Sequence, residues 1–96
     1  MDQDNRPSVE LLESAHVFPG VYRLKVIGEV SDDFEGRVLA AVAEEVAAVS
    51  EVDHATRNTP DGRHISLTLD VTVQSADQVR AIYARLHLVS GLKLLL

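Results

Sequence analysis

The amino-acid sequence predicts an α+β sandwich in which two helices cover one face of a four-stranded antiparallel sheet. Two segments alternate apolar and polar residues with period two, as half-buried strands do. Two others repeat apolar residues every 3.6 positions, as helices packed along one stripe do. These patterns follow one another in the order β-α-β-β-α-β, on a chain of 96 residues that has room for a single core.

The first strand is predicted from Val21 to Gly28, where the glycine is expected to end it. Its apolar face consists of Tyr22, Leu24 and Val26. Its opposite, more polar face consists of Val21, Arg23, Lys25 and Ile27.

The first helix is predicted to start at Ser31 or Asp32, either of which suits an N-cap, with Glu35 as the capping-box partner of Asp32. Asp33 and Arg37 are expected to form an ion pair one turn apart on its outer side. The apolar stripe predicts about four to five turns. Its members are Phe34, Val38, Ala41, Val42, Val46 and Val49.

A weaker, polar strand is predicted at residues 54–59, before a turn in which Pro60, Asp61 and Gly62 favour chain reversal. The strand after this turn has the clearest alternation in the chain. Its inward residues are Ile65, Leu67, Leu69, Val71 and Val73.

Ser75 is expected to cap the second helix, with Gln78 as its capping-box partner and an outer ion pair between Asp77 and Arg80. The inner stripe of this helix consists of Val79, Ile82, Tyr83 and Leu86. Gly91 ends the unit, and residues 92–96 are predicted to form a last short strand. In that strand Leu92, Leu94 and Leu96 are expected to point inward and Leu95 outward.

Two helices on one side of four strands in this order form the ferredoxin-like βαββαβ arrangement. The right-handed crossover rule places the first and third strands at the centre of the sheet and the second and last strands at its edges. The polar strand at residues 54–59 suits an edge position.

Composition excludes several classes of function. Fifteen acidic against nine basic residues give a net charge of −6, which opposes binding to nucleic acids and to anionic membranes. The absence of cysteine excludes disulfides and thiolate chemistry. No apolar run approaches the roughly 18 residues of a membrane span, and the first residues lack the features of a secretory signal. We therefore expect a cytoplasmic protein.

The chain is expected to divide into a polar N-terminal leader and one domain. Residues 1–16 form the leader, which contains a short amphipathic turn after Pro7. Leu11 and Leu12 of that turn are expected to cover an edge of the core. Residues 17–96 form the single ferredoxin-like domain.

No catalytic or metal-binding set emerges from the sequence. The four histidines, His16, His54, His64 and His87, fall on separate elements. If Thr59 faces His64 across the turn, His54 faces Leu69, so the two strand histidines are not partners. Ser31 and Ser75 are explained as helix caps, and no residue set supports a named reaction. We therefore expect a protein without enzymatic activity, cofactor or metal.

Stacking of RNA bases on the open sheet face, as some modules of this topology do, is also disfavoured. It needs exposed aromatic side chains, and the chain has four aromatic residues. Tyr22, Phe34 and Tyr83 fall on core positions, and Phe18 precedes the first strand.

An ordered set of short motifs resembles the YbeD-like family of small bacterial proteins over about residues 10–96. The motifs are Glu10-Leu11-Leu12-Glu13, Phe18-Pro19, Lys25-Val26 before Gly28, Gly62 with Ser66, Asp77-Gln78-Val79, Tyr83 with Leu86, and Leu92-Lys93-Leu94-Leu95-Leu96. The resemblance implies a ferredoxin-like fold similar to ACT regulatory domains, and no established biochemical activity.

The open sheet face is the main candidate for function, because it concentrates cations on an acidic protein. The candidate partner-binding residues are Arg23, Lys25, Ser66, Thr68, Lys93 and Leu95. The alternative is that Arg23 or Lys25 simply pairs with Asp70 on the neighbouring strand. The sequence leaves both interpretations open.

Two functions follow as hypotheses. The first is a non-catalytic protein-binding or regulatory module that acts through the open sheet face and the C-terminal edge strand, with another protein as partner or with a second copy as a homodimer. The second, implied by the resemblance, is an ACT-like sensor of a small metabolite. Its candidate ligand-binding residues are Gly28, Asp32 and Asp33.

Overall fold

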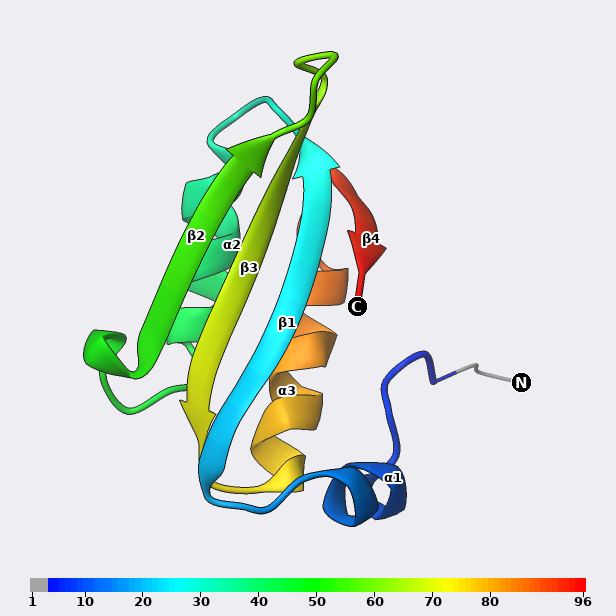
Figure 1. Ribbon diagram of the computed structural model, residues 1–96, viewed down its shortest axis with the longest axis vertical. Helices are drawn as coiled ribbons and strands as arrows, with labels where there is room; N and C mark the ends of the chain where they lie inside the picture. Colours follow the sequence, from blue (N-terminus) through cyan, green and yellow to red (C-terminus); the bar gives the residue numbers. More distant parts are fainter. Residues whose placement is uncertain (1–3) are drawn as a thin grey trace.

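The computed structural model describes residues 4–96 and has the predicted order of strands and main helices. The elements are α1 (Val9–Ala15), β1 (Gly20–Glu29), α2 (Phe34–Ala43), the 3-10 helix η1 (Val49–Glu51), β2 (Val52–Asn58), β3 (His64–Val73), α3 (Ala76–His87) and β4 (Leu92–Leu95). The sheet is antiparallel in the order β2-β3-β1-β4, and α2 and α3 cover one of its faces (Figure 1). The ferredoxin-like prediction is confirmed, including which strands are central.

The pairing of β1 with β3 sets the two faces of the sheet. The two strands are in register from Gly20 opposite Val73 to Glu29 opposite His64. Because side chains alternate along each strand, every inward residue of β1 meets an inward residue of β3. The core that results consists of Leu12, Tyr22, Leu24, Val26, Phe34, Val38, Val42, Leu67, Leu69, Val71, Val73, Ala76, Val79, Ile82, Tyr83 and Leu86.

Helix α2 is shorter than predicted and ends at Ala43, after ten residues. The apolar period continues beyond it because Val46 still packs against the core from a turn. Gln78 of α3 fixes that turn, since its Nε2 donates to the carbonyl oxygen of Glu45 at 2.8 Å. The apolar spacing therefore reflects contact with the core and continues past the last residue of the helix. The side chain of Val49 lies outside the described residues.

The start of α2 also differs from the prediction. Asp33 is the N-cap, and its carboxylate accepts from the backbone N–H of Gly36 at 3.2 Å. Asp32 and Asp33 both have positive φ, near 50°, which turns the chain sharply into the helix. With Asp33 occupied in this way, the expected ion pair with Arg37 does not form.

Arg37 instead ties two loops together. Its Nε donates to the carbonyl oxygen of Asp32 at 2.8 Å, and one terminal nitrogen donates to that of Ser90 at 2.7 Å. Its guanidinium also lies over the ring of Phe34, 5.6 Å from the centroid. One side chain thus joins the loop that follows β1 to the loop that precedes β4.

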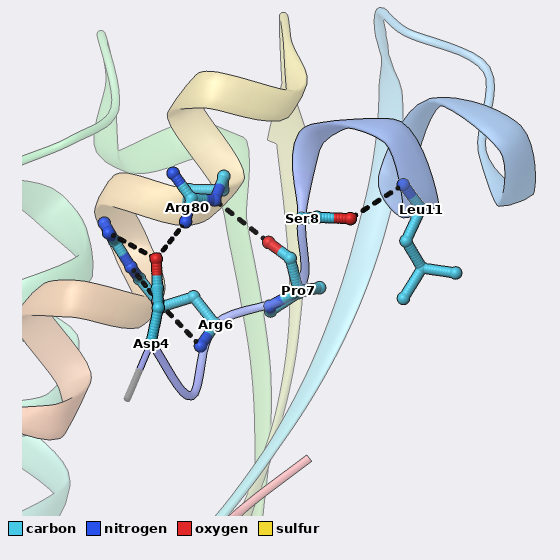
Figure 2. A network of polar contacts seen from close by, with 6 residues as sticks. All are labelled: Asp4, Arg6, Pro7, Ser8, Leu11 and Arg80. Atoms are coloured by element: carbon cyan, nitrogen blue, oxygen red, sulfur yellow. Dashed lines mark hydrogen bonds and ion pairs between the residues drawn. The ribbon is translucent and has the colours of Figure 1, made fainter. Parts of the chain in front are cut away.

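The N-terminal segment is attached to α3 by both packing and polar contacts. Ser8 caps α1, and Leu12 is 2% exposed whereas Leu11 is 58% exposed. The expectation that both leucines cover the core is right for Leu12 and wrong for Leu11. The predicted pair between Asp77 and Arg80 is replaced, because Arg80 bonds the carbonyl oxygen of Pro7 at 3.0 Å and the carboxylate of Asp4 (Figure 2).

Strand β4 is out of phase with the prediction because its pairing with β1 is irregular. Gly28 lies opposite Leu92, but Ile27 lies opposite Leu94, so one extra residue, Lys93, interrupts the alternation. Leu95 lies opposite the buried Val26 and packs against the core. Leu96 pairs with Lys25 and is 61% exposed. The expectation that Leu94 and Leu96 point inward and Leu95 outward is therefore wrong.

The contrast between Leu11 and Leu12 is testable by truncation. Leu12→Ala is expected to lower the free energy of unfolding by about 2–5 kcal/mol, since it leaves a cavity under α1. Leu11→Ala is the matched control and should change it by less than about 0.5 kcal/mol. Urea unfolding followed by circular dichroism measures both, and equal losses would contradict the docking of α1.

Candidate functional site

The face of the sheet opposite α2 and α3 is the candidate site. Among the described residues no helix covers it (Figure 1). Strand β1 contributes Val21, Arg23, Lys25 and Ile27, and β3 contributes Ser66, Thr68, Asp70 and Thr72. The register places Lys25 opposite Thr68 and Ile27 opposite Ser66. Four of the six predicted partner-binding residues therefore share this face on the two central strands, namely Arg23, Lys25, Ser66 and Thr68.

Arg23 is neutralised by Asp70, its direct neighbour on β3. Its Nε and a terminal nitrogen donate to the two carboxylate oxygens at 2.8 and 2.9 Å. These hydrogen bonds hold the pKa of Asp70 below its ordinary value. The sequence left open whether Arg23 binds a partner or pairs with Asp70 on the neighbouring strand. In the structure Arg23 pairs with Asp70.

Lys25 has a different environment. It is exposed, its backbone pairs with that of Leu96, and it makes no ion pair within residues 4–96. Toward β3 the residue opposite Lys25 is Thr68, and toward β4 the side chains nearest in the register are aliphatic. Ile27 follows on β1, and Leu94 lies opposite Ile27. A cation with aliphatic groups on its β4 side is thus the centre of the β1–β4 half of this face.

Three aliphatic residues of this half are far more exposed than core residues. Val21 is 66% exposed, Leu94 46% and Leu96 61%. Sequence reasoning missed the outward direction of Leu94, because the extra residue in β4 has no pattern of its own. We call Val21, Lys25, Ile27, Leu94 and Leu96 the β1–β4 patch.

The remaining two predicted partner-binding residues lie elsewhere. Lys93 forms an ion pair with Glu29, with 3.1 Å between Nζ and Oε1, and both side chains are half exposed. Leu95 packs against the core, so it cannot serve the outward contact proposed for it. Neither residue belongs to the patch.

The loop proposed for a small ligand borders a pocket of about 240 Å³. Of its three candidate residues only Asp33 lines that pocket. Gly28 lies within β1 instead of ending it, and it faces inward under Phe34, where a Cβ would come 2.1 Å from Cζ. Asp32 offers its carbonyl oxygen to Arg37. The pocket is lined by Val30, Ser31, Asp33, Phe34, Glu35 and Ile65.

The histidines are dispersed as the register argument predicts. His54 lies opposite Leu69, and its Nε2 is 3.3 Å from a carboxylate oxygen of Glu35. In the part of the chain that the structure describes, no group of three or more potential metal ligands converges.

A buried tyrosine pair was not foreseen. The hydroxyl oxygens of Tyr22 and Tyr83 are 3.0 Å apart in the core, and the rings meet edge to face. Burial raises the pKa of Tyr83 well above its ordinary value, so its hydroxyl stays protonated. Because each hydroxyl is the partner of the other, the pair satisfies two buried polar groups inside an apolar core.

Within residues 4–96 no helix is long and apolar enough to cross a bilayer.

Comparison with known proteins finds one family and a group of bacterial relatives. The family described as "Protein of unknown function (DUF493)" matches residues 13–96. A UPF0250 protein of Shewanella piezotolerans is 33% identical over 84 residues, which are 88% of this chain and 89% of the relative. A UPF0250 protein of Shewanella sediminis is 34% identical over 86 residues, with the same shares of both chains.

The pairing of Arg23 with Asp70 predicts a pH effect. In Arg23→Gln the pKa of Asp70 should rise toward its ordinary value of 3.8. Since the folded-state pKa is lowered, the stability from this pair is complete above that value and is lost as pH falls through the lowered pKa. NMR titration of the Asp70 carboxyl carbon measures the shift. Arg57→Gln is the control, and an unchanged pKa in Arg23→Gln would exclude this role.

Proposed function

The chain belongs to the DUF493 family, to which the YbeD-like UPF0250 proteins belong, and within that family we propose that it is a non-catalytic cytoplasmic module that binds another protein. The proposed contact is the open sheet face, centred on the β1–β4 patch, together with the edge of β4. The observation that carries the proposal is the grouping of exposed aliphatic residues around Lys25.

Apolar groups on this face favour a macromolecular partner. Val21, Leu94 and Leu96 are each at least 46% exposed, and burial of apolar area contributes about 25 cal/mol per Å². Lys25 adds specificity for an acidic group at the rim of the partner. The face has no aromatic residue for base stacking, because Tyr22, Phe34 and Tyr83 are buried and Phe18 packs against the core. A protein partner fits this chemistry better than RNA.

The edge of β4 adds a second element to the same contact. Lys25 and Leu96 exchange both backbone hydrogen bonds, at 3.0 and 2.9 Å. Backbone groups alternate in direction along an antiparallel strand, so Leu95 directs its N–H and C=O away from β1. Such an edge accepts a strand of another protein or of a second copy.

Support for a non-catalytic role comes from the tasks that the polar side chains already have. Ser75 caps α3, Asp33 caps α2, and Asp70 is paired with Arg23. These groups are explained by the stability of the fold.

Affinity capture tests the proposal. With the chain immobilised and lysate of its own organism applied, a double variant, Lys25→Glu with Leu94→Ser, should lose at least about tenfold of a specifically retained protein, since about 1.4 kcal/mol is tenfold. Leu88→Ser is the matched control, because Leu88 is 84% exposed at the end of α3, away from this face. Equal capture by the double variant and the control would rule the surface out. Self-association of the purified protein would identify a homodimer in place of a separate partner.

A second candidate function, an ACT-like sensor of a small metabolite, is supported by the pocket beside residues 28–33. Asp33 and Glu35 place two carboxyl groups at its rim, and Phe34 and Ile65 supply apolar walls. This lining suits a small ligand with a cationic group better than one with a free carboxylate. The volume of about 240 Å³ limits the ligand to a small metabolite.

A thermal-shift screen of amino acids and small amines tests the sensor. A ligand at 100 times its Kd should add about 2.7 kcal/mol to the stability. Val30→Trp, which fills the pocket, should abolish the shift, and Val17→Trp is the control at another exposed valine. A flat screen, or a shift that Val30→Trp retains, would count against the sensor.

A further inference from the structure

Strand β1 has a free edge along its first half. It has ten residues, whereas β4 has four and pairs only with the second half of β1. Within residues 4–96 the last backbone pair on this side joins Lys25 to Leu96. In Figure 1 the lower half of β1 extends past the end of β4, toward α1.

The backbone of this free edge is aligned for strand pairing. Lys25 directs both its N–H and its C=O toward Leu96, at 3.0 and 2.9 Å. In a regular strand every second residue directs its backbone groups to the same side, so Arg23 and Val21 face this edge too. No described residue bonds these four groups. They form a short ladder without a partner, in line with β4.

We propose that this edge of β1, at Val21 and Arg23, is a strand-addition site for an extended acidic segment of another protein. The segment would run antiparallel to β1, as β4 does, and would complete the fourth strand of the sheet. The inference rests on the proposed function, because it names the form in which a protein partner binds beside the β1–β4 patch.

The side chains beside the edge determine the chemistry of the segment. A partner residue opposite Arg23 places its side chain on the open face, next to Arg23 and diagonal to Lys25. A carboxylate suits this position and a cation does not, because Lys25 makes no ion pair among the described residues whereas Arg23 is already paired with Asp70. Two residues further on, the partner lies opposite Val21, which is 66% exposed, and an aliphatic side chain suits it. The recognised pattern is therefore an acidic residue followed two positions later by an aliphatic one.

Within residues 4–96 the charged side chains of the open face leave this edge free. The ion pair draws the guanidinium of Arg23 across β1 to Asp70 of β3, which is the opposite side from the free edge. The lysine nearest the edge, Lys25, is exposed and makes no ion pair among the described residues, so its side chain is available to a neighbour. Charged side chains that usually protect a sheet edge are thus directed elsewhere.

A second copy fits this edge poorly. If two β1 strands paired antiparallel about Tyr22, Pro19 of the second copy would come opposite Lys25, a place that Leu96 holds. The same pairing would place Val21 of the second copy opposite Arg23 and diagonal to Lys25, where it offers no carboxylate to that cation. These two conflicts favour a separate acidic segment.

An NMR titration with synthetic peptides tests the site on the full chain. The probe is acetyl-Thr-Glu-Thr-Val-Thr-amide, in which glutamate would lie opposite Arg23 and valine opposite Val21. We expect shifts of the Val21 and Arg23 amides that saturate at millimolar peptide, with slower hydrogen exchange of both. The same peptide with lysine in place of glutamate should bind at least fivefold more weakly.

Backbone methylation supplies matched controls. N-methyl groups on the glutamate and valine nitrogens remove donors that face β1 and should abolish binding. An N-methyl group on the central threonine, which faces away, should leave binding within about twofold. On the protein, Val21→Pro removes one N–H of the free edge without touching the β1–β3 ladder, and it should also abolish binding.

Several outcomes would overturn the proposal. They are unperturbed Val21 and Arg23 amides, equal binding of the glutamate and lysine peptides, and equal binding of the peptides methylated at facing and at central positions. Protection of both amides without peptide, in a protein that sediments as a dimer, would assign the edge to a second copy and overturn it as well. If the peptides fail while capture still depends on Lys25 and Leu94, the strand site is wrong and the protein-binding surface stands. If the peptides bind while capture does not depend on Lys25 and Leu94, the protein-binding surface is wrong and the strand site stands.

Discussion

The continuous pairing of β1 with β3 is the constraint on which the rest of the structure depends. Ten residues of each strand are in register, so one alternating pattern assigns a whole face to the core and the other to the outside. Both helices then have a single apolar surface on which to pack. The edge strands β2 and β4 pair with this central β1–β3 unit. The candidate surfaces are the parts of the sheet that the helices and edge strands leave exposed.

Charge is distributed unevenly over this sheet. The net charge is −6, yet two of the three charged residues on the outer face of β1, Arg23 and Lys25, are cations. Arg23 is matched by Asp70, and Lys93 by Glu29, so Lys25 is the cation on which recognition depends in our proposals. Removing water from Lys25 costs free energy unless a carboxylate pairs with it. Burial of its aliphatic neighbours is favourable and offsets part of that cost.

Local patterns predicted the fold and the two faces of β1 and β3, because side-chain alternation is set by the backbone itself. These patterns gave wrong predictions where contacts with a segment distant in sequence determine the structure. Helix α2 ends at Ala43 although Val46 keeps the apolar period, and Arg37 and Arg80 bond loop carbonyls in place of their sequence neighbours. In the candidate site, Arg23, Lys25, Ser66 and Thr68 were placed correctly on the outer face. The predicted directions of Leu94, Leu95 and Leu96 were wrong, because the extra residue in β4 depends on how that strand pairs with β1.

The burial of Leu12 separates two boundaries that are often treated as one. The family match starts at residue 13, whereas the side chain of Leu12 is 2% exposed within the core. The shared sequence and the cooperative folding unit therefore do not begin at the same residue. A chain trimmed to the shared region would lack Leu12 and would expose the apolar groups beneath α1. Low solubility of such a fragment would then result from the truncation and would not be a property of the whole chain.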